Sequence, residues 1–203
     1  MSKPLFLLVI FTIMTTILTA QELKIQEVGR YTDGRPNTLE IVTYDSTTAC
    51  IFITNAASKS IDIVNISHPN SPFLVKKVDI SPYGGGVNSV VYLKNGYFAA
   101  AIEDSIKQNR GKVVFFESNG KYVNQVQVGA LPDMVTVTPD GKKVLVANEG
   151  EPNAAYTNDP EGSISIIDIS SGIPQLTQQQ VKTLHFKNAP KKIKGSIRKP
   201  DAT

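Results

Sequence analysis

Residues 132–148 read PDMVTVTPDGKKVLVAN, and this stretch decides the fold. It contains two short runs rich in β-branched residues, Met134 to Val137 and Lys143 to Ala147, on either side of the turn sequence Thr138 to Lys142. Proline presets φ for such a turn, and glycine tolerates the positive φ that completes it. Two β-rich runs around a polar turn predict an antiparallel hairpin.

The hairpin belongs to a unit that the chain repeats. Two more β-rich runs follow it, Ser163 to Ile167 and Val181 to Leu184, so the unit holds four. In two earlier units the four runs begin at Glu40, Cys50, Ser60 and Phe73, and at Ser89, Tyr97, Lys112 and Tyr122. Equivalent positions lie 48 residues apart from Glu40 to Asn88 and 45 residues apart from Asn88 to Asp133. Four short strands in a period of about 40–50 residues are typical of a β-propeller blade, whereas an immunoglobulin-like sandwich would not repeat one four-run unit.

We therefore expect an all-β chain, a β-propeller of four-stranded blades with about three blades present and the ring incomplete. The units span about residues 37–80, 86–129 and 131–186, within a partial propeller over residues 21–203 that ends in a basic tail, residues 187–203. Propellers typically have roughly 4–8 blades. Three blades would leave apolar faces and strand edges open, which favours association.

The first twenty residues have the pattern of an export signal. Lys3 precedes an apolar run, Leu5 to Leu18, and the small residue Ala20 follows it. The run is shorter than the roughly 20 residues of a membrane span, which favours a cleaved signal peptide over residues 1–20. This predicts a secreted, periplasmic or cell-surface protein with no membrane span after signal cleavage.

Composition excludes several classes of protein. The 203 residues carry a net charge of +3, which is too small to indicate nucleic acid as a partner. Cys50 is the single cysteine, so neither an intramolecular disulfide nor a Cys/His zinc site can form. Neither His68 nor His185 has a nucleophile at a readable spacing, so we predict no catalytic residue.

Two kinds of motif resemble known propeller families. Residues 128–133 (VGALPD) and 137–148 (VTPDGKKVLVAN) resemble the YVTN-type repeat, and residues 60–72 (SIDIVNISHPNSP) resemble an LVIVD-type repeat. Residues 147–152 (ANEGEP) and 159–168 (DPEGSISIID) are similar to the choice-of-anchor I family. That family includes bacterial surface proteins and the mesenchyme-specific cell-surface glycoproteins of animals. Its members are longer and carry a sorting anchor at the far C-terminus, so the resemblance implies an N-terminal fragment of such a propeller.

Polar residues at equivalent places suggest a metal site. With the first strand of each blade innermost, Glu40, Asn88 and Asp133 fall where these strands begin, at the mouth of the channel. Ca²⁺ takes roughly 6–8 oxygen ligands, so we expect Ca²⁺ as a cofactor there, in a position similar to the channel calcium of paraoxonase-like propellers. The alternative is that these side chains only cap strand ends.

A second, weaker candidate is the long loop of the third unit. Loops of this length are often functional, and this one holds the acidic residues Glu149, Glu151, Asp159 and Glu161. The alternative is a solvated acidic loop without a ligand.

Two functions remain open from the sequence. We expect a secreted or cell-surface β-propeller that binds an extracellular ligand, whether an ion, a glycan, a protein or a mineral-related ligand. The alternative is a cation-dependent hydrolase of the phosphatase or esterase kind, with a metal in the channel that polarises the scissile group. A general base near the channel would distinguish the two, and the sequence does not indicate one.

Export can be tested directly. Signal cleavage after Ala20 predicts that N-terminal sequencing of secreted material begins at or near Gln21. Intact Met1 in a soluble cytoplasmic pool would contradict the prediction.

Overall fold

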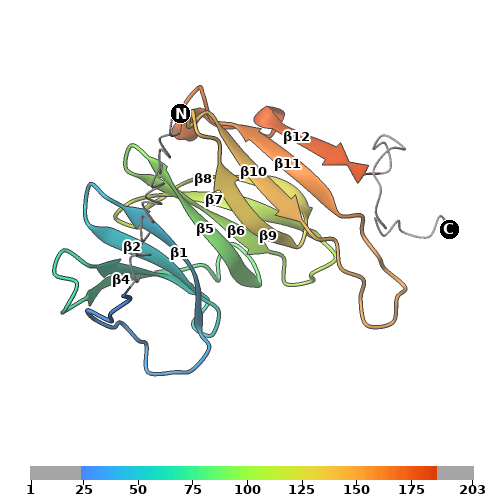
Figure 1. The fold of residues 1–203 in the computed structure, drawn as a ribbon. Helices are drawn as coiled ribbons and strands as arrows, with labels where there is room; N and C mark the ends of the chain where they lie inside the picture. The colour runs from blue at the N-terminus through green and yellow to red at the C-terminus, as the bar shows by residue number, and fades with distance from the viewer. Residues whose placement is uncertain (1–23, 187–203) are drawn as a thin grey trace, which may run out of the picture.

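The computed structural model describes residues 24–186. The predicted signal peptide, residues 1–20, and the basic tail, residues 187–203, lie outside the described residues. The described part forms three four-stranded antiparallel sheets, which we call blades 1 to 3 (Figure 1). In each blade the strands pair in chain order, as a meander does. The prediction of an all-β propeller with four-stranded blades is confirmed, and within residues 24–186 the blades do not close into a ring.

The strands are short and lie close to the β-rich runs of the sequence. Blade 1 contains β1 (Leu39–Asp45), β2 (Cys50–Asn55), β3 (Ser60–Asn65) and β4 (Phe73–Asp79). Blade 2 contains β5 (Gly86–Lys94), β6 (Tyr97–Glu103), β7 (Arg110–Glu117) and β8 (Tyr122–Ala130). Blade 3 contains β9 (Pro132–Val137), β10 (Lys143–Asn148), β11 (Ser163–Asp168) and β12 (Val181–His185), with the 3-10 turns η1 (Ile173–Gln175) and η2 (Gln178–Gln180) before β12.

The first strands of the blades, β1, β5 and β9, lie side by side where the three sheets converge (Figure 1). The backbone N–H of Tyr92 donates to Thr43 Oγ1 over 3.0 Å, which joins β5 to β1. In the same way Val135 N–H donates to Ser89 Oγ over 3.3 Å and joins β9 to β5. These bonds fix neighbouring blades to each other at their inner edge.

Two apolar cores hold the blades together, one on each face of blade 2. Between blades 1 and 2, the Phe52 ring stacks on the Phe98 ring with their centroids 4.5 Å apart. The Phe98 ring also stacks on the Phe116 ring, with their centroids 5.1 Å apart. Between blades 2 and 3, Phe115 of β7 is fully buried with Val146 of β10 in one cluster. Alternate residues of a strand point to opposite faces, so the two middle strands of blade 2, β6 and β7, are apolar at almost every position between their ends.

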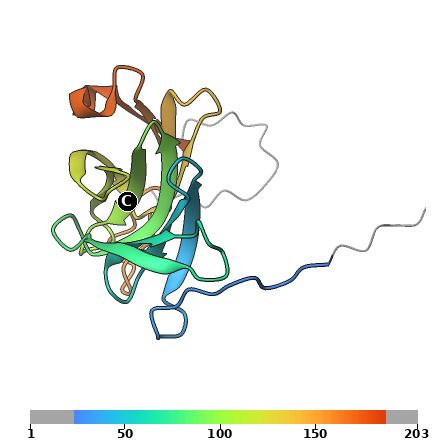
Figure 2. The ribbon, with the colours of Figure 1, turned by 90° about the vertical axis from the view of Figure 1, so that its left-hand side faces the viewer.

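The segment before β1 is held against blade 1 by a buried charge. Figure 2 shows this segment looping at the end of blade 1 and then leading away from the molecule. Tyr31 donates its hydroxyl to Asp62 Oδ2 over 2.9 Å, and the Asp62 side chain has no exposed surface. The same carboxylate accepts from Lys77 Nζ at 2.6 Å, from Ser60 Oγ at 2.9 Å and from Asn55 Nδ2 at 3.3 Å. Every one of its partners is polar, so this face of blade 1 is built around a satisfied buried aspartate.

The Asp62 network gives a prediction about stability. Burial raises the pKa of Asp62, but the hydrogen bonds from Lys77 and its other partners outweigh burial and hold the pKa below the ordinary value of 3.8. Because the pKa of Asp62 is lower in the folded than in the unfolded protein, its ionised carboxylate stabilises the fold at pH values above the pKa of the unfolded state. This stabilisation is lost as the pH falls through the pKa of Asp62 in the folded state. We expect Asp62→Asn to lower the free energy of unfolding by about 1–3 kcal/mol at pH 7, with a smaller difference from the parent below about pH 4.

Urea unfolding of the full chain at several pH values measures this difference. The control is Asp79→Asn, at the exposed end of β4, where the hydrogen bonds described for the carboxylate come from Ser81, two residues further on. Equal losses in the two variants would show that the Asp62 network contributes nothing specific.

Candidate functional site

The polar residues singled out by the sequence lie at one end of the sheets, which we call the loop face. At this end β5 and β9 begin and β6 and β10 end, because Gly86 pairs with Glu103 and Pro132 pairs with Asn148. The β6–β7 and β10–β11 loops leave from the same end. A propeller collects side chains from several blades on such a face, so this is where the candidate site is built.

Glu40, Asn88 and Asp133 occupy equivalent positions in the three innermost strands. Each falls where the pairing with the second strand shifts register, between Leu39 and Val42 in β1, between Val87 and Ser89 in β5, and opposite the Ala147–Asn148 step in β9. A β-bulge leaves such a residue out of the ladder and turns its side chain in a new direction. The repeated position is thus a repeated local distortion of the backbone.

Asn88 joins two blades. Its Nδ2 donates to the Pro132 carbonyl of blade 3 over 3.0 Å and to Glu103 Oε2 over 3.3 Å. The Asn88 amide therefore satisfies the Pro132 carbonyl at the start of β9. It also fixes the position of the Glu103 carboxylate at the end of β6. These are contacts of a residue that caps strand ends, the alternative interpretation of the sequence.

Asp133 acts electrostatically on Glu149 of the β10–β11 loop. Partial burial raises the pKa of Glu149, and the negative charges of Asp133 and Glu151 raise it further, while Lys107 lowers it. The backbone holds Glu149 in place, because its N–H donates to the Leu131 carbonyl over 2.9 Å. Asp133, from the predicted channel site, and Glu151, from the predicted acidic loop, thus both act on Glu149 of that loop.

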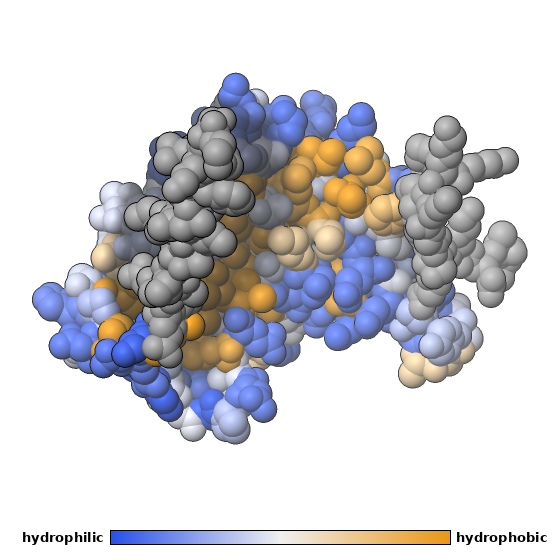
Figure 3. Space-filling view, in the orientation of Figure 1, coloured by the Kyte–Doolittle hydropathy of each residue, from blue (hydrophilic) through white to orange (hydrophobic). Residues whose placement is uncertain are grey.

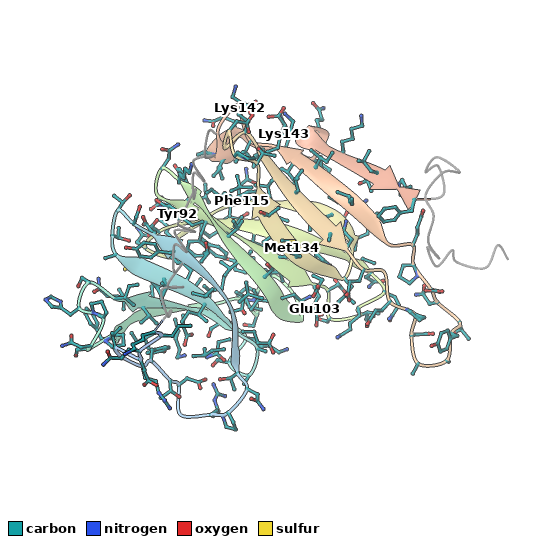
Figure 4. All side chains as sticks on the ribbon, in the orientation of Figure 1. Tyr92, Glu103, Phe115, Met134, Lys142 and Lys143 are labelled. Atoms are coloured by element: carbon teal, nitrogen blue, oxygen red, sulfur yellow. The ribbon has the colours of Figure 1, made fainter. Side chains whose placement is uncertain are left out.

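The β6–β7 loop completes this group. Lys107 Nζ lies 3.8 Å from Glu103 Oε2, and Gln108 Nε2 donates to the Glu151 carbonyl over 3.1 Å. We call the group the acidic mouth and define it as Glu103, Lys107, Asp133, Glu149 and Glu151. Figure 4 labels Glu103 at this end of the sheets, below Met134 on the same side of the molecule.

The sequence did not single out Glu103 and Lys107. A signal for Glu103 existed, since it ends the second strand of its blade as Asn55 and Asn148 do. Lys107 had no such signal, because its place depends on the path of an irregular loop.

The structure shows other surroundings for the remaining predicted residues, although the backbone of Glu161 packs against Gly150, between Glu149 and Glu151. Glu40 is exposed on β1, and none of the hydrogen bonds or ion pairs described for residues 24–186 joins it to Asn88 or Asp133. Glu161 Oε2 lies 3.0 Å from His185 Nδ1, a contact that fixes the loop to β12. Asp159 lies further along the same loop and is half-buried.

Metal binding remains a prediction. Among residues 24–186, no group of three or more His, Cys, Asp or Glu side chains has the geometry to hold a metal ion. The carboxylates of the acidic mouth nevertheless outnumber its one lysine. An excess of negative charge in a partly buried site attracts cations.

A cleft lies at the opposite end of the sheets from the acidic mouth, between the turns of blades 1 and 2. This cleft of about 540 Å³ is lined by Cys50, Ile63, Val75 and Tyr97 among others. Cys50 is buried, and its Sγ lies 3.7 Å from Asn65 Nδ2 and 3.6 Å from the Thr48 carbonyl.

No helix within residues 24–186 is long and apolar enough to cross a membrane.

The blades and their shared loop face define a β-propeller protein. More particularly, the chain belongs to the choice-of-anchor I family, whose domain matches residues 40–199. This confirms the resemblance found in the sequence. No curated protein matches the chain in sequence.

Solved structures similar to the chain are propeller proteins of greater length. The hydrazine synthase of Kuenenia stuttgartiensis shares 18% identity at a TM-score of 0.53, over 72% of this chain and 37% of that one. A putative 6-phosphogluconolactonase of Bacteroides fragilis shares 17% identity at a TM-score of 0.53, over 72% and 39%. Sqt1 of Saccharomyces cerevisiae shares 15% identity at a TM-score of 0.52, over 76% and 38%. The chain thus spans less than two fifths of these proteins, and the likeness concerns the fold alone.

Proposed function

We propose that this chain forms part of an extracellular β-propeller that binds its ligand at the acidic mouth of the loop face. Membership of the choice-of-anchor I family supports a surface protein. Whether the chain is secreted, periplasmic or attached to the cell surface belongs to the proposal. The observation that supports the ligand site is the bond from Gln108 to the Glu151 carbonyl, which brings the β6–β7 loop to the acidic β10–β11 loop.

The charge of the mouth supports a cation as the ligand. The acidic mouth, as defined above, holds four carboxylates and one lysine, Lys107, which lies near Glu103 and lowers the pKa of Glu149. Of the ligand classes open from the sequence, an ion or a mineral-related ligand matches this excess of carboxylates better than a neutral glycan. Carboxylates are the ligands that Ca²⁺ prefers, so Ca²⁺ is the proposed ion, with waters or further ligands completing its shell.

A hydrolase has less support. A metal-dependent hydrolase needs a group that activates water or a nucleophile beside the metal. Both histidines of the described residues lie elsewhere, His185 against Glu161 and His68 in the turn before β4. We therefore propose a binding function.

Calorimetry with Ca²⁺ tests the site in the full chain at pH 7. We expect binding that weakens about tenfold or more in Asp133→Asn and in Glu149→Gln, because each loses one negative ligand. Glu27→Gln removes a carboxylate of the exposed segment before β1 and serves as the control, with no change expected. Absence of Ca²⁺ binding in the parent, or unchanged binding in Asp133→Asn, would contradict the proposal.

The pH dependence of Ca²⁺ affinity gives a second test. Ca²⁺ binds the ionised carboxylate, and the pKa of Glu149 is raised in the free protein. We therefore expect the affinity to begin falling at a higher pH than an ordinary glutamate would give. Glu149→Gln should move this onset to lower pH, whereas Glu27→Gln should leave it in place. Identical pH profiles in the parent and Glu149→Gln would contradict a role for Glu149.

A further inference from the structure

Two Asn-Gly dipeptides lie in turns of blade 2, at the end of the sheets opposite the acidic mouth. Asn95 and Gly96 join β5 to β6, and Asn119 and Gly120 lie in the turn between β7 and β8. Both asparagines are exposed, and both line the rim of the cleft between blades 1 and 2. Blade 2 packs against a neighbouring blade on each face, so the surroundings of both turns are set by blades that the structure describes.

Asparagine is chemically labile in water, and most labile when glycine follows it. The backbone nitrogen of the glycine attacks the side-chain carbonyl carbon, Cγ, and forms a C–N bond. The bond from Cγ to the side-chain nitrogen then breaks, and ammonia leaves with the proton of the glycine N–H, which closes a succinimide ring. Water opens this ring at either carbonyl and gives aspartate or isoaspartate. Glycine favours the attack because it has no Cβ to crowd its nitrogen.

The Asn119 turn holds both partners of this reaction in place. Asn119 Oδ1 accepts from the Lys121 N–H over 2.8 Å, and its Nδ2 donates to Glu117 Oε2 over 3.0 Å. The Gly120 N–H, whose nitrogen would attack, donates to the Glu117 carbonyl over 2.7 Å. Reaction at Asn119 therefore has to break hydrogen bonds of the side-chain amide and of the attacking nitrogen.

The Asn95 turn is less restrained and more strained. Among the hydrogen bonds described for residues 24–186, none involves the Asn95 side chain. Lys94, Asn95 and Gly96 follow one another with φ angles of 68°, 53° and 80°. Glycine adopts positive φ freely and asparagine tolerates it, but the Cβ of a lysine is crowded there. Such strain makes local opening of the turn easier, and opening lets the Asn95 side chain and the next peptide rotate toward each other.

We propose that Asn95 is a site of spontaneous modification in the folded protein, at which water converts the asparagine into aspartate and isoaspartate. The Gly96 carbonyl accepts from the Ser118 N–H over 2.7 Å, which ties the β5–β6 turn to the β7–β8 turn. Isoaspartate lengthens the main chain by one carbon atom immediately before Gly96 and adds a negative charge. The modified turn therefore fits this bond poorly and loosens at the rim of the cleft.

Peptide mapping by mass spectrometry tests the site, with Asn119 as the control within the same chain. The full chain is incubated at mildly alkaline pH, folded and in parallel in urea, and loss of the amide is followed at both asparagines. We expect Asn95 to react about fivefold or more faster than Asn119 in the folded chain, because only the Asn119 turn has to break hydrogen bonds. In urea the two rates should converge. Equal rates in the folded chain, or faster reaction at Asn119, would overturn the proposal.

Lys94→Gly separates the strain of the turn from the dipeptide itself. Glycine removes the crowded Cβ at positive φ, so we expect Asn95 to react about twofold or more slowly in the folded variant. The rates at Asn119, and at Asn95 in urea, should stay unchanged. Lys142→Gly removes an exposed lysine from the β9–β10 turn and is the matched control, with no change expected at Asn95. Circular dichroism confirms that each variant is folded, and an unchanged or faster rate at Asn95 in folded Lys94→Gly would contradict the role of the strained turn.

Discussion

Blade 2 is buried on both faces, and the rest of the structure depends on this. Phe98 and Phe116 pack toward blade 1, while Ala99 and Phe115 pack toward blade 3. Burying one such phenylalanine contributes roughly 1.5–3 kcal/mol, and its neighbours on the strand must be apolar as well. A strand with two buried faces has no place for polar side chains except at its ends. The charged side chains of β6 and β7 therefore lie at or near the strand ends, where Glu103 and the loop after β6 are found.

The faces of blades 1 and 3 that are turned away from blade 2 differ in polarity. Blade 1 places Asp62 in the middle of its free face and satisfies it with four donors, one of them Tyr31 from the segment before β1. Blade 3 keeps Ile164 and Ile166 at the corresponding place and remains apolar. The Asp62 side chain is thus satisfied within blade 1 and the segment before it, whereas the apolar face of blade 3 (Figure 3) gains free energy when another apolar sheet covers it.

Much of the fold could be predicted from the sequence, because β-rich runs and polar turns are local signals. The candidate site was less predictable. The equivalence of Glu40, Asn88 and Asp133 is real, but it reflects bulges that turn the side chains in directions the alternating pattern does not give. Asn88 consequently bonds to Pro132, a contact between blades that no spacing within one unit indicates. Lys107 enters the acidic mouth from an irregular loop, and such paths depend on tertiary contacts.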